Sequence, residues 1–336
     1  MSSKSMAQDH QLLLEWYRSH QRDLPWRKSK DPYKIWISEV MLQQTTVAAV
    51  IPYYERFLQL FPQLTDLAAA PESQVLKAWA GLGYYSRARN LHKAAKVLSK
   101  TGFPRTAKEL IELPGFGPYT SAAVASIAFD DPTGVLDGNV IRVLCRKEGL
   151  DIDWWGGSAR QDLQRRATAF ALQGRPSEIN QALMELGATI CTPQAPTCLL
   201  CPWSKRCEAR KSNRVSSIPR PKPRKKIEIW VWNPIVHRKA HQVALIQRQD
   251  TPVLKGQWLF PGEFKKVLKK PKTFHTRHGI THHDLYVSVE VSTKSPKSEG
   301  LQWVDVEKVV EINPSKLLQK ILDQAVLIPK KRGSPR

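Results

Sequence analysis

The stretch TAKELIELPGFGPYTSAAVASIAF, residues 106–129, decides the fold. Its first part, TAKELIEL, and its last part, SAAVASIAF, are rich in helix-compatible apolar residues, so each predicts a helix. Between them lies LPGFGPYT, in which Gly115 and Gly117 permit the backbone angles that a tight turn requires. The stretch therefore predicts two helices joined by a hairpin.

This hairpin also predicts a contact with a polyanion. With no side chain at Gly115 or Gly117, the backbone amides and the start of the following helix can face a phosphate group. Such contacts position a nucleic acid without reading its sequence. The alternative is a plain corner between two helices that binds nothing.

Outward from the hairpin, the chain divides into parts of different character. Helical spacing of apolar residues, punctuated by proline and glycine, predicts an all-helical domain over residues 1–211. A basic, proline-rich linker is expected over 212–226, where no apolar period remains. Alternating and β-branched segments predict a mixed α and β domain over 227–328, followed by a basic tail at 329–336. The fold class is thus a helical domain followed by an α+β domain.

The charge of the chain points to the same kind of partner. Lysine and arginine number 52 against 30 acidic residues, a formal net charge of +22 over 336 residues. Such an excess favours nucleic acid as the partner. Basic tails supply part of the charge, but the helical part is basic as well. The sequence offers neither a long apolar run nor a secretion signal, so we expect no membrane contact and a cytoplasmic location.

Four cysteines predict a metal centre. Cys191, Cys198, Cys201 and Cys207 are separated by six, two and five residues, and only Cys145 lies elsewhere. In a reducing compartment a tight group of thiols favours a metal site over disulfides. Zinc ribbons usually use two short CxxC pairs, whereas only one such pair occurs here, which favours an iron–sulfur cluster. Zinc, or no metal, stays open, and Cys145 is expected in the core.

Two acidic residues are candidate catalysts. Glu39 in WISEVMLQQT has apolar neighbours on a predicted helix, and an acid so placed can be protonated near neutral pH. Its alternative is a solvated helix face. Asp137 in VLDGNV precedes a predicted helix near Asn139, some twenty residues past the hairpin. A carboxylate at this helix start can face the same nucleic-acid strand that the hairpin contacts. Its alternative is a simple N-cap.

Aromatic and glutamine side chains form a further candidate surface. GLGYYSRARN offers Tyr84 and Tyr85 next to Arg87 and Arg89, and MLQQTT offers Gln44. Flat side chains beside arginines favour contact with bases, and the alternative is buried aromatic packing.

Together these motifs resemble the endonuclease-III superfamily of DNA glycosylases, and within it the MutY-type adenine DNA glycosylases. The resemblance covers the first 210 residues and rests on motifs that stand in the family's order. They are LPWR from Leu24, DPYKIWISEVMLQQTTVAAVIPYYERF from Asp31, WAGLGYYSRARNLHKAA from Trp79, LPGFGPYT, VLDGNVIRVL, NQALMELGATICTP from Asn180, and the four cysteines. The resemblance implies a two-lobed helix-hairpin-helix fold, one 4Fe-4S cluster on those cysteines, and removal of adenine mispaired with 8-oxoguanine or guanine.

The same resemblance implies roles for individual residues. Glu39 would protonate a flipped adenine, Asp137 would stabilise the sugar cation, and Asn139 would orient that region. Tyr119 would lie beside the sugar. The adenine pocket would be lined by Trp26, Arg27 and Gln181. The space left around the lesion pair would be filled by Gln44 and Tyr84.

One position separates the branches of this superfamily. Bifunctional glycosylase-lyases have a lysine just after the hairpin that forms a Schiff base. Here that position is Tyr119, and the nearest lysine, Lys108, precedes the hairpin. We therefore expect a monofunctional enzyme that leaves an abasic site.

The second domain resembles the MutT-like, Nudix-type recognition module of this family, through VALIQRQDTPVLKGQWLFPGE. A working Nudix hydrolase needs a glutamate-rich box, but the segment after Gly262 has one acid, Glu263, so pyrophosphatase activity is not expected. The aromatic-Ser-His segment that reads 8-oxoguanine in the family aligns with Ile280, Thr281 and His282, and the aromatic ring is missing here. A metal cluster of His275, His278, His282 and His283 is the alternative.

Two rival functions remain open from the sequence. One is a glycosylase of this fold that acts on thymine or an oxidised pyrimidine. The other is a DNA-binding protein without catalysis. In the favoured interpretation the protein acts as a monomer on double-stranded DNA and is associated with the nucleoid of a bacterial-type cell.

Overall fold

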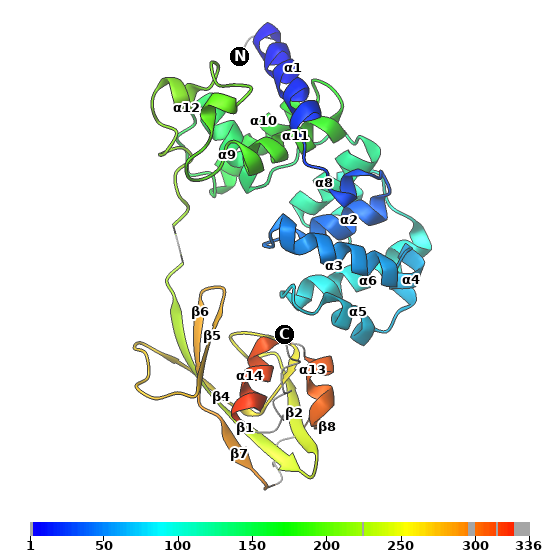
Figure 1. Cartoon of the computed structure of the whole chain (residues 1–336), viewed down its shortest axis with the longest axis vertical. Coiled ribbons are helices and arrows are strands. Elements are labelled where there is room, and N and C mark those ends of the chain that lie inside the picture. Colours follow the sequence, from blue (N-terminus) through cyan, green and yellow to red (C-terminus); the bar gives the residue numbers. More distant parts are fainter. Residues whose placement is uncertain (1–2, 224, 295–299, 314, 326–336) are drawn as a thin grey trace, which may run out of the picture. The chain divides into compact units, whose positions relative to one another are not determined.

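The chain folds into two compact units that meet in sequence between residues 223 and 224 (Figure 1). The computed structural model describes residues 3–223, 225–294, 300–313 and 315–325. The basic tail predicted at 329–336 lies outside the described residues.

The first unit is built from helices throughout its described part. They are α1 (Ser3–His20), η1 (Pro25–Arg27), α2 (Pro32–Met41), α3 (Val47–Leu60), α4 (Leu64–Ala69), α5 (Glu72–Trp79), α6 (Tyr85–Thr101), α7 (Ala107–Leu110), α8 (Pro118–Phe129), α9 (Gly138–Glu148), α10 (Gly157–Ala171), α11 (Pro176–Thr189), η2 (Cys198–Leu200) and α12 (Glu208–Lys211).

These helices pack around two hydrophobic cores, which define two lobes. The first lobe, η1 with α2–α8, buries side chains between Leu24 and Val135. The second lobe, α1 with α9–α12, buries side chains of α1 and others between Leu136 and Ile218. Met184 on α11 packs against both cores, so the lobes meet at this helix. The predicted two-lobed helical fold is confirmed.

The hairpin occurs where the sequence predicts it, between α7 and α8. Its first helix is shorter than the predicted TAKELIEL and ends at Leu110. Leu113 precedes Pro114, and a residue before proline is disfavoured from helical geometry. Pro118 begins α8, and proline suits this first position because a backbone N–H there would have no acceptor within the helix.

The linker predicted over 212–226 is shorter in the structure. Ile218 is buried in the core of the second lobe, and its carbonyl accepts a hydrogen bond from Arg146 Nε at 2.8 Å. Arg214 and Arg220 both pair with Asp151. These contacts bind the first part of the segment to the helical unit, although it lacks an apolar period.

The second unit is a mixed sheet with short helices. Its elements are β1 (Glu228–Lys239), β2 (Gln242–Arg248), β3 (Gln257–Leu259), β4 (Gly262–Val267), β5 (Thr276–Ile280), β6 (His283–Val287), β7 (Glu290–Ser292), β8 (Leu301–Asp305), η3 (Val306–Lys308), α13 (Val309–Ile312) and α14 (Lys316–Gln324). The strand order is β3-β2-β1-β6-β5, with β4 and β7 on β1 and β8 on β2. β1 pairs antiparallel with β4 and parallel with β6. The apolar face of α14 shares one core with the sheet, so the predicted α+β character is confirmed.

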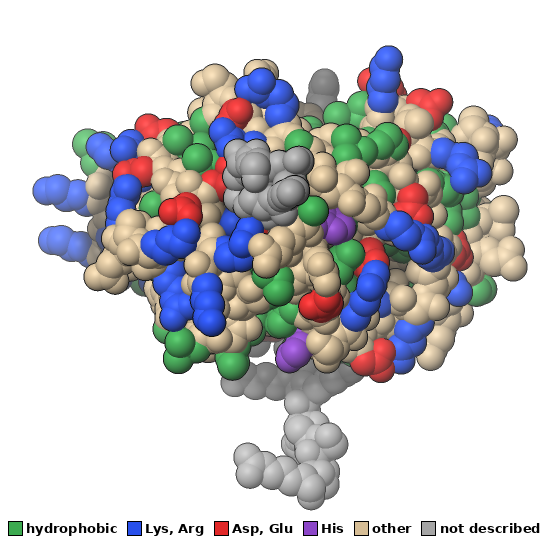
Figure 2. All heavy atoms as spheres, turned by 90° about the horizontal axis from the view of Figure 1, so that it is seen from above, with side chains coloured by type: hydrophobic (Ala, Val, Ile, Leu, Met, Phe, Trp, Pro, Cys, Tyr) green, Lys and Arg blue, Asp and Glu red, His purple; other side chains and the backbone are tan. Residues whose placement is uncertain are grey.

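Basic side chains are spread over the surface. On the face drawn in Figure 2, lysine and arginine are widespread and acidic side chains are fewer, as the net charge of +22 leads one to expect. In the described part of the chain, no helix has both the length and the apolar composition of a membrane span.

Candidate active site and metal centre

A cavity of about 210 Å³ lies in the helical unit and is lined by residues of both lobes. It brings together seven of the residues that the sequence predicts for catalysis and adenine binding. They are Trp26, Arg27, Glu39, Tyr119, Asp137, Asn139 and Gln181.

Glu39 is buried in the wall of this cavity. It lies on α2, whose residues from Ile35 to Met41 are all buried, and it is itself only 5% exposed. Tyr119 donates a hydrogen bond from its hydroxyl to Glu39 Oε2 at 2.5 Å. Burial, the largest cause, and the neighbouring Asp137 raise the pKa of Glu39, the Tyr119 hydrogen bond lowers it, and the resulting pKa is about 7. The solvated-face alternative is therefore wrong, and Glu39 can donate a proton near neutral pH.

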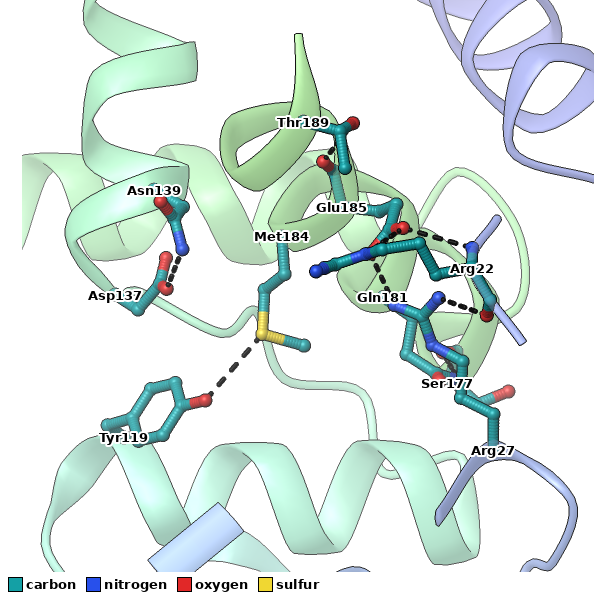
Figure 3. Close-up of polar contacts among 10 residues, drawn as sticks. All are labelled: Arg22, Arg27, Tyr119, Asp137, Asn139, Ser177, Gln181, Met184, Glu185 and Thr189. Atoms are coloured by element: carbon teal, nitrogen blue, oxygen red, sulfur yellow. Dashed lines mark hydrogen bonds and ion pairs between the residues drawn. The ribbon is translucent and has the colours of Figure 1, made fainter. Parts of the chain in front are cut away.

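Tyr119 lies in the first turn of α8, directly after the hairpin. Its hydroxyl also lies 3.7 Å from Met184 Sδ, which extends toward it in Figure 3. Burial raises the pKa of Tyr119 well above its usual value, and the charge of Glu39 raises it too. The phenol thus stays protonated and orients the Glu39 carboxyl group.

Asp137 is the N-cap of α9 and also lines the cavity. One carboxylate oxygen accepts from the Val140 amide at 2.7 Å, and the other accepts from Asn139 Nδ2 at 2.9 Å. Burial raises the pKa of Asp137, whereas these hydrogen bonds lower it. The N-cap alternative is correct, but it does not compete with a role in the cavity. The cap fixes where the carboxylate points.

A hydrogen-bonded chain leads from this carboxylate to a cysteine. Asn139 donates to Asp137 and accepts from Arg142 Nη2 at 2.8 Å. Arg142 Nε donates to the Cys191 carbonyl at 2.6 Å, and its Nη2 donates to the Gly187 carbonyl at 2.7 Å. Arg142 was not singled out from the sequence. Its spacing of i+3 from Asn139 on one helix is the signal that was available.

Gly187 allows α9 and α11 to approach closely at this chain. A Cβ at this position would lie 2.6 Å from Asn139 Cβ and 3.0 Å from its backbone. Replacing Gly187 by Ala is expected to lower the free energy of unfolding by about 1–3 kcal/mol, because the helices must separate. Denaturant unfolding measures this. Gly157, with open space around it in α10, is the matched control, and equal effects of Gly157→Ala and Gly187→Ala would contradict the close approach.

The opposite wall of the cavity carries a buried ion-pair cluster, drawn in Figure 3. Glu185, with a side chain that is 0% exposed, accepts from Arg22 Nε and from Arg27 Nη2, both at 2.7 Å. Burial raises the pKa of Glu185, but the two arginines lower it to about 2. Gln181, one turn earlier on α11, donates to the Ser177 carbonyl at 2.9 Å. Glu185 was missed from the sequence, although it follows Gln181 by four residues and shares its helix face.

The hairpin glycines lie outside this cavity, at the start of α8. Gly115 has φ of 81°, and a Cβ there would approach Asn90 Cβ to 2.7 Å, so glycine is required. Gly117 caps α8 with an ordinary φ of −94° and has no atom within 4 Å of a Cβ position. The open space at Gly117 leaves room for a ligand group beside the cap of α8.

Gln44 and Tyr84 do not line the cavity. Both have left-handed backbones, with φ of 58° and 49°, and Tyr84 is 42% exposed. The sequence led us to expect that the neighbouring Arg87 and Arg89 form a free basic surface, but both have partners in the structure. Arg87 donates to backbone carbonyls, and Arg89 pairs with Glu72 at 3.2 Å. These two guanidinium groups already have partners within the protein.

The four cysteines converge on a small cavity of about 30 Å³. No disulfide joins them, and Arg146 Nη1 lies 3.5 Å from Cys191 Sγ. Burial and, to a lesser extent, the other three thiols raise the pKa of Cys201 to about 12. The four thiols line one cavity, so a metal centre bound there would hold them as thiolates, and the Arg146 guanidinium would stabilise their negative charge. Cys145 is fully buried, as predicted.

In the second unit, Thr281 and His282 form the turn between β5 and β6. Thr281 has φ of 56°, which is uncommon for a β-branched residue and suggests a functional turn. Of the four histidines in the alternative metal cluster, His282 and His283 come together, with Glu228, and His275 and His278 do not join this group. The Glu228 carboxylate already accepts from Lys266 at 2.6 Å and Trp230 at 3.1 Å, which weighs against a cation there.

Comparison with known proteins agrees with this geometry. The family described as HhH-GPD superfamily base excision DNA repair protein matches residues 37–164. An adenine DNA glycosylase of Buchnera aphidicola subsp. Schizaphis graminum is 33% identical over 339 residues, covering 93% of this chain and 97% of that protein. The human adenine DNA glycosylase is 50% identical over 210 residues, covering 59% of this chain and 38% of its own length. This chain thus spans about two fifths of the length of its mammalian relatives.

A solved structure supports the same fold for the helical unit. A thermostable thymine-DNA glycosylase superposes with a TM-score of 0.55 at 30% identity. The match covers 63% of this chain and 100% of that structure.

Proposed function

Since this chain belongs to the adenine DNA glycosylase family, we propose that it removes adenine mispaired with 8-oxoguanine or guanine in double-stranded DNA. The reaction hydrolyses the N-glycosidic bond and leaves an abasic site. The observation that carries this proposal is the pair of carboxyl groups in one cavity. Glu39 has a pKa of about 7 and can donate a proton, while the hydrogen-bonded Asp137 is suited to remain ionised.

The proposed reaction divides the work between these two acids. Glu39 protonates a ring nitrogen of the bound adenine, so that the base leaves as a neutral molecule. As the glycosidic bond breaks, positive charge develops on the sugar, and the Asp137 carboxylate stabilises it electrostatically or through a transient covalent bond. Water then supplies the hydroxyl group at the sugar carbon, and its other proton returns to the ionised Glu39 carboxylate. Tyr119 and Asn139 hold the two carboxyl groups in place.

Access to the cavity requires the adenine to leave the duplex. Enzymes that act on a base extrude it into a pocket. In this proposal, the amides at Gly115 and Gly117 bind a backbone phosphate next to the lesion. Trp26, Arg27 and Gln181 surround the extruded adenine, while Gln44 and Tyr84 fill the space that it leaves.

We also propose that the four cysteines hold one 4Fe-4S cluster. Cys191, Cys198, Cys201 and Cys207 offer the four thiolates that such a cluster requires. Only Cys198 and Cys201 form a CxxC pair, whereas zinc ribbons usually use two, and this spacing supports the assignment over zinc. When bound, the cluster would offset part of the thiolate charge and link the end of α11 to η2 and the start of α12.

The proposed function is tested by following base release from a duplex with adenine opposite 8-oxoguanine, with products resolved before and after alkali. Strand scission only after alkali would support a monofunctional enzyme, as expected with Tyr119 in the position of the Schiff-base lysine. A product trapped by borohydride would contradict it. A duplex with thymine opposite guanine belongs in the same assay, because the thymine-DNA glycosylase at 30% identity makes thymine the second candidate base.

The rate of adenine release is expected to depend on pH through Glu39. Its pKa is raised from 4.5 to about 7, so the protonated form that the reaction needs is lost as pH rises through 7. In this range kcat/KM should fall by up to about tenfold per pH unit. The pKa of Asp137 is also raised, so a second loss should occur at acidic pH, somewhat above its ordinary value. A rate that stays constant through about pH 8.5 would contradict this role for Glu39.

We propose that the second unit is a MutT-like module that reads 8-oxoguanine through Thr281 and His282. Ending the chain after Pro223 should reduce the preference for 8-oxoguanine over guanine by about tenfold or more, because one base-reading contact contributes about 1–3 kcal/mol. The ratio of the two release rates measures this. Full-length His282→Ala should lower the same ratio, and His237→Ala on β1 is the matched control. An unchanged ratio in both the truncated protein and His282→Ala would remove the recognition role.

A further inference from the structure

Arg87 occupies an unusual position beneath two surface loops. Its guanidinium group donates hydrogen bonds to five backbone carbonyls. Nη1 donates to Val40 (2.8 Å), Met41 (3.2 Å) and Gln43 (2.5 Å), and Nη2 donates to Leu82 (3.2 Å) and Gly83 (3.4 Å).

The acceptors belong to two segments that are far apart in sequence. One is the end of α2 and the turn after it, where carbonyls lack partners within the helix. The other is the loop between α5 and α6. The faces of the guanidinium group are covered as well, by the Trp79 ring at 5.5 Å and the Tyr84 ring at 5.2 Å. Arg87 therefore fastens both loops to each other.

Each loop places one exceptional residue directly after its last Arg87 contact. Gln44 follows Gln43, and Tyr84 follows Gly83. Both have left-handed backbones, with φ of 58° and 49°. For residues other than glycine such a conformation costs about 1–3 kcal/mol and persists only where the surroundings enforce it. Arg87 supplies that enforcement for both residues at once.

We infer that Arg87 is a positioning residue for base extrusion, which holds Gln44 and Tyr84 in the orientation that fills the gap left by the flipped adenine. The inference rests on the proposed function and extends it to a residue that does not line the cavity. Lysine cannot replace this arginine. The planar guanidinium group donates from two nitrogens to carbonyls in both loops, whereas the single ammonium group of lysine cannot reach both. The positive charge alone is not what the loops require.

The prediction separates extrusion from chemistry. Arg87→Lys should slow adenine release opposite guanine by about 100-fold, the loss typical of a misplaced positioning group. For adenine opposite an abasic-site analogue, where no pairing has to be broken, the same variant should act at nearly the wild-type rate. Arg89→Lys is the matched control, since Arg89 lies on the same helix and pairs only with Glu72 in its described contacts.

Two further measurements decide how Arg87 acts. In a Glu39→Gln background, which blocks release, the fluorescence of 2-aminopurine in place of adenine should rise more slowly with Arg87→Lys than without it. The rate losses of Arg87→Lys and Tyr84→Ala should not multiply in the double variant, because residues that act as a unit are not additive.

Three results would overturn the inference. They are equal slowing on paired and unpaired adenine, multiplying losses in the double variant, and an Arg87→Lys protein that is unfolded at the assay temperature. The last would mean that Arg87 supports the whole lobe. The wild-type protein distinguishes this from failure of the proposed function, because a wild type that releases adenine from neither duplex refutes the function itself.

Discussion

Replacing Glu39 by Gln is expected to slow adenine release on the order of 10³-fold, within the range for loss of a general acid. Gln has the size of Glu and its side-chain oxygen can still accept from Tyr119, so the cavity should keep its shape. What it lacks is the proton that a neutral carboxyl group donates. Binding to a duplex with adenine opposite 8-oxoguanine should therefore stay unchanged.

Single-turnover kinetics and a binding titration on the same duplex measure both quantities. Glu55→Gln is the matched control, because Glu55 is an exposed glutamate on the neighbouring helix α3. A parallel loss of release and binding would mean that Glu39 has a structural role only.

The same substitution should change stability in the opposite direction. The pKa of Glu39 rises from 4.5 to about 7 on folding, so its favourable contribution is complete below pH 4.5 and is lost as pH rises through 7. Well above pH 7 the buried carboxylate costs about 3 kcal/mol relative to a group that does not ionise. Glu39→Gln should therefore melt at a higher temperature than wild type at about pH 8.5, and the gap should shrink as the pH falls.

Replacing Asp137 by Asn should slow adenine release by about 10²- to 10³-fold, as expected when one group that stabilises transition-state charge is removed. Asparagine is as good an N-cap as aspartate, so α9 should keep its first turn. The substitution thus removes the negative charge near the sugar and leaves the cap. This separates the two roles that the structure gives to Asp137.

Asp31→Asn provides the control, because Asp31 caps α2 through the same type of bond, to the Tyr33 amide at 2.9 Å. Release rates and melting temperatures of the two variants should be compared. If Asp31→Asn and Asp137→Asn lose stability together and release adenine at the wild-type rate, Asp137 is a cap and nothing more.

The sequence carried the parts of this site that depend on local pattern. The Asp137 cap, the hairpin turn and the cysteine spacing are each set by a few consecutive residues, and local preferences decide them. The burial of Glu39 could only be suspected, because the spacing of apolar residues does not decide whether the side of α2 that carries Glu39 faces solvent or protein. Its environment comes from α8, some eighty residues away in the chain.

Residues whose partners are distant in sequence were not predicted. Glu185 pairs with arginines about 160 positions earlier, and Arg87 contacts backbone that only the folded chain brings near. Ile218 and Arg220 read as part of a linker because isolated anchors have no period. Ile218 is buried beside α9, and the exposed Arg220 pairs with Asp151 in the loop after α9.

The two cores divide the proposed chemistry between them. Trp26, Arg27 and Glu39, which would hold the base, stand on the first lobe, whereas Asp137 and Asn139, which would face the sugar, stand on the second. Gln181 on α11 is the one proposed base contact from the second lobe. A lineage could therefore change which base is accepted mainly by altering side chains of the first lobe, with the sugar chemistry left intact on the other. Base specificity would then evolve through the side chains of half of the cavity. Glycosylases for different bases could diverge while the residues that act on the sugar stay the same.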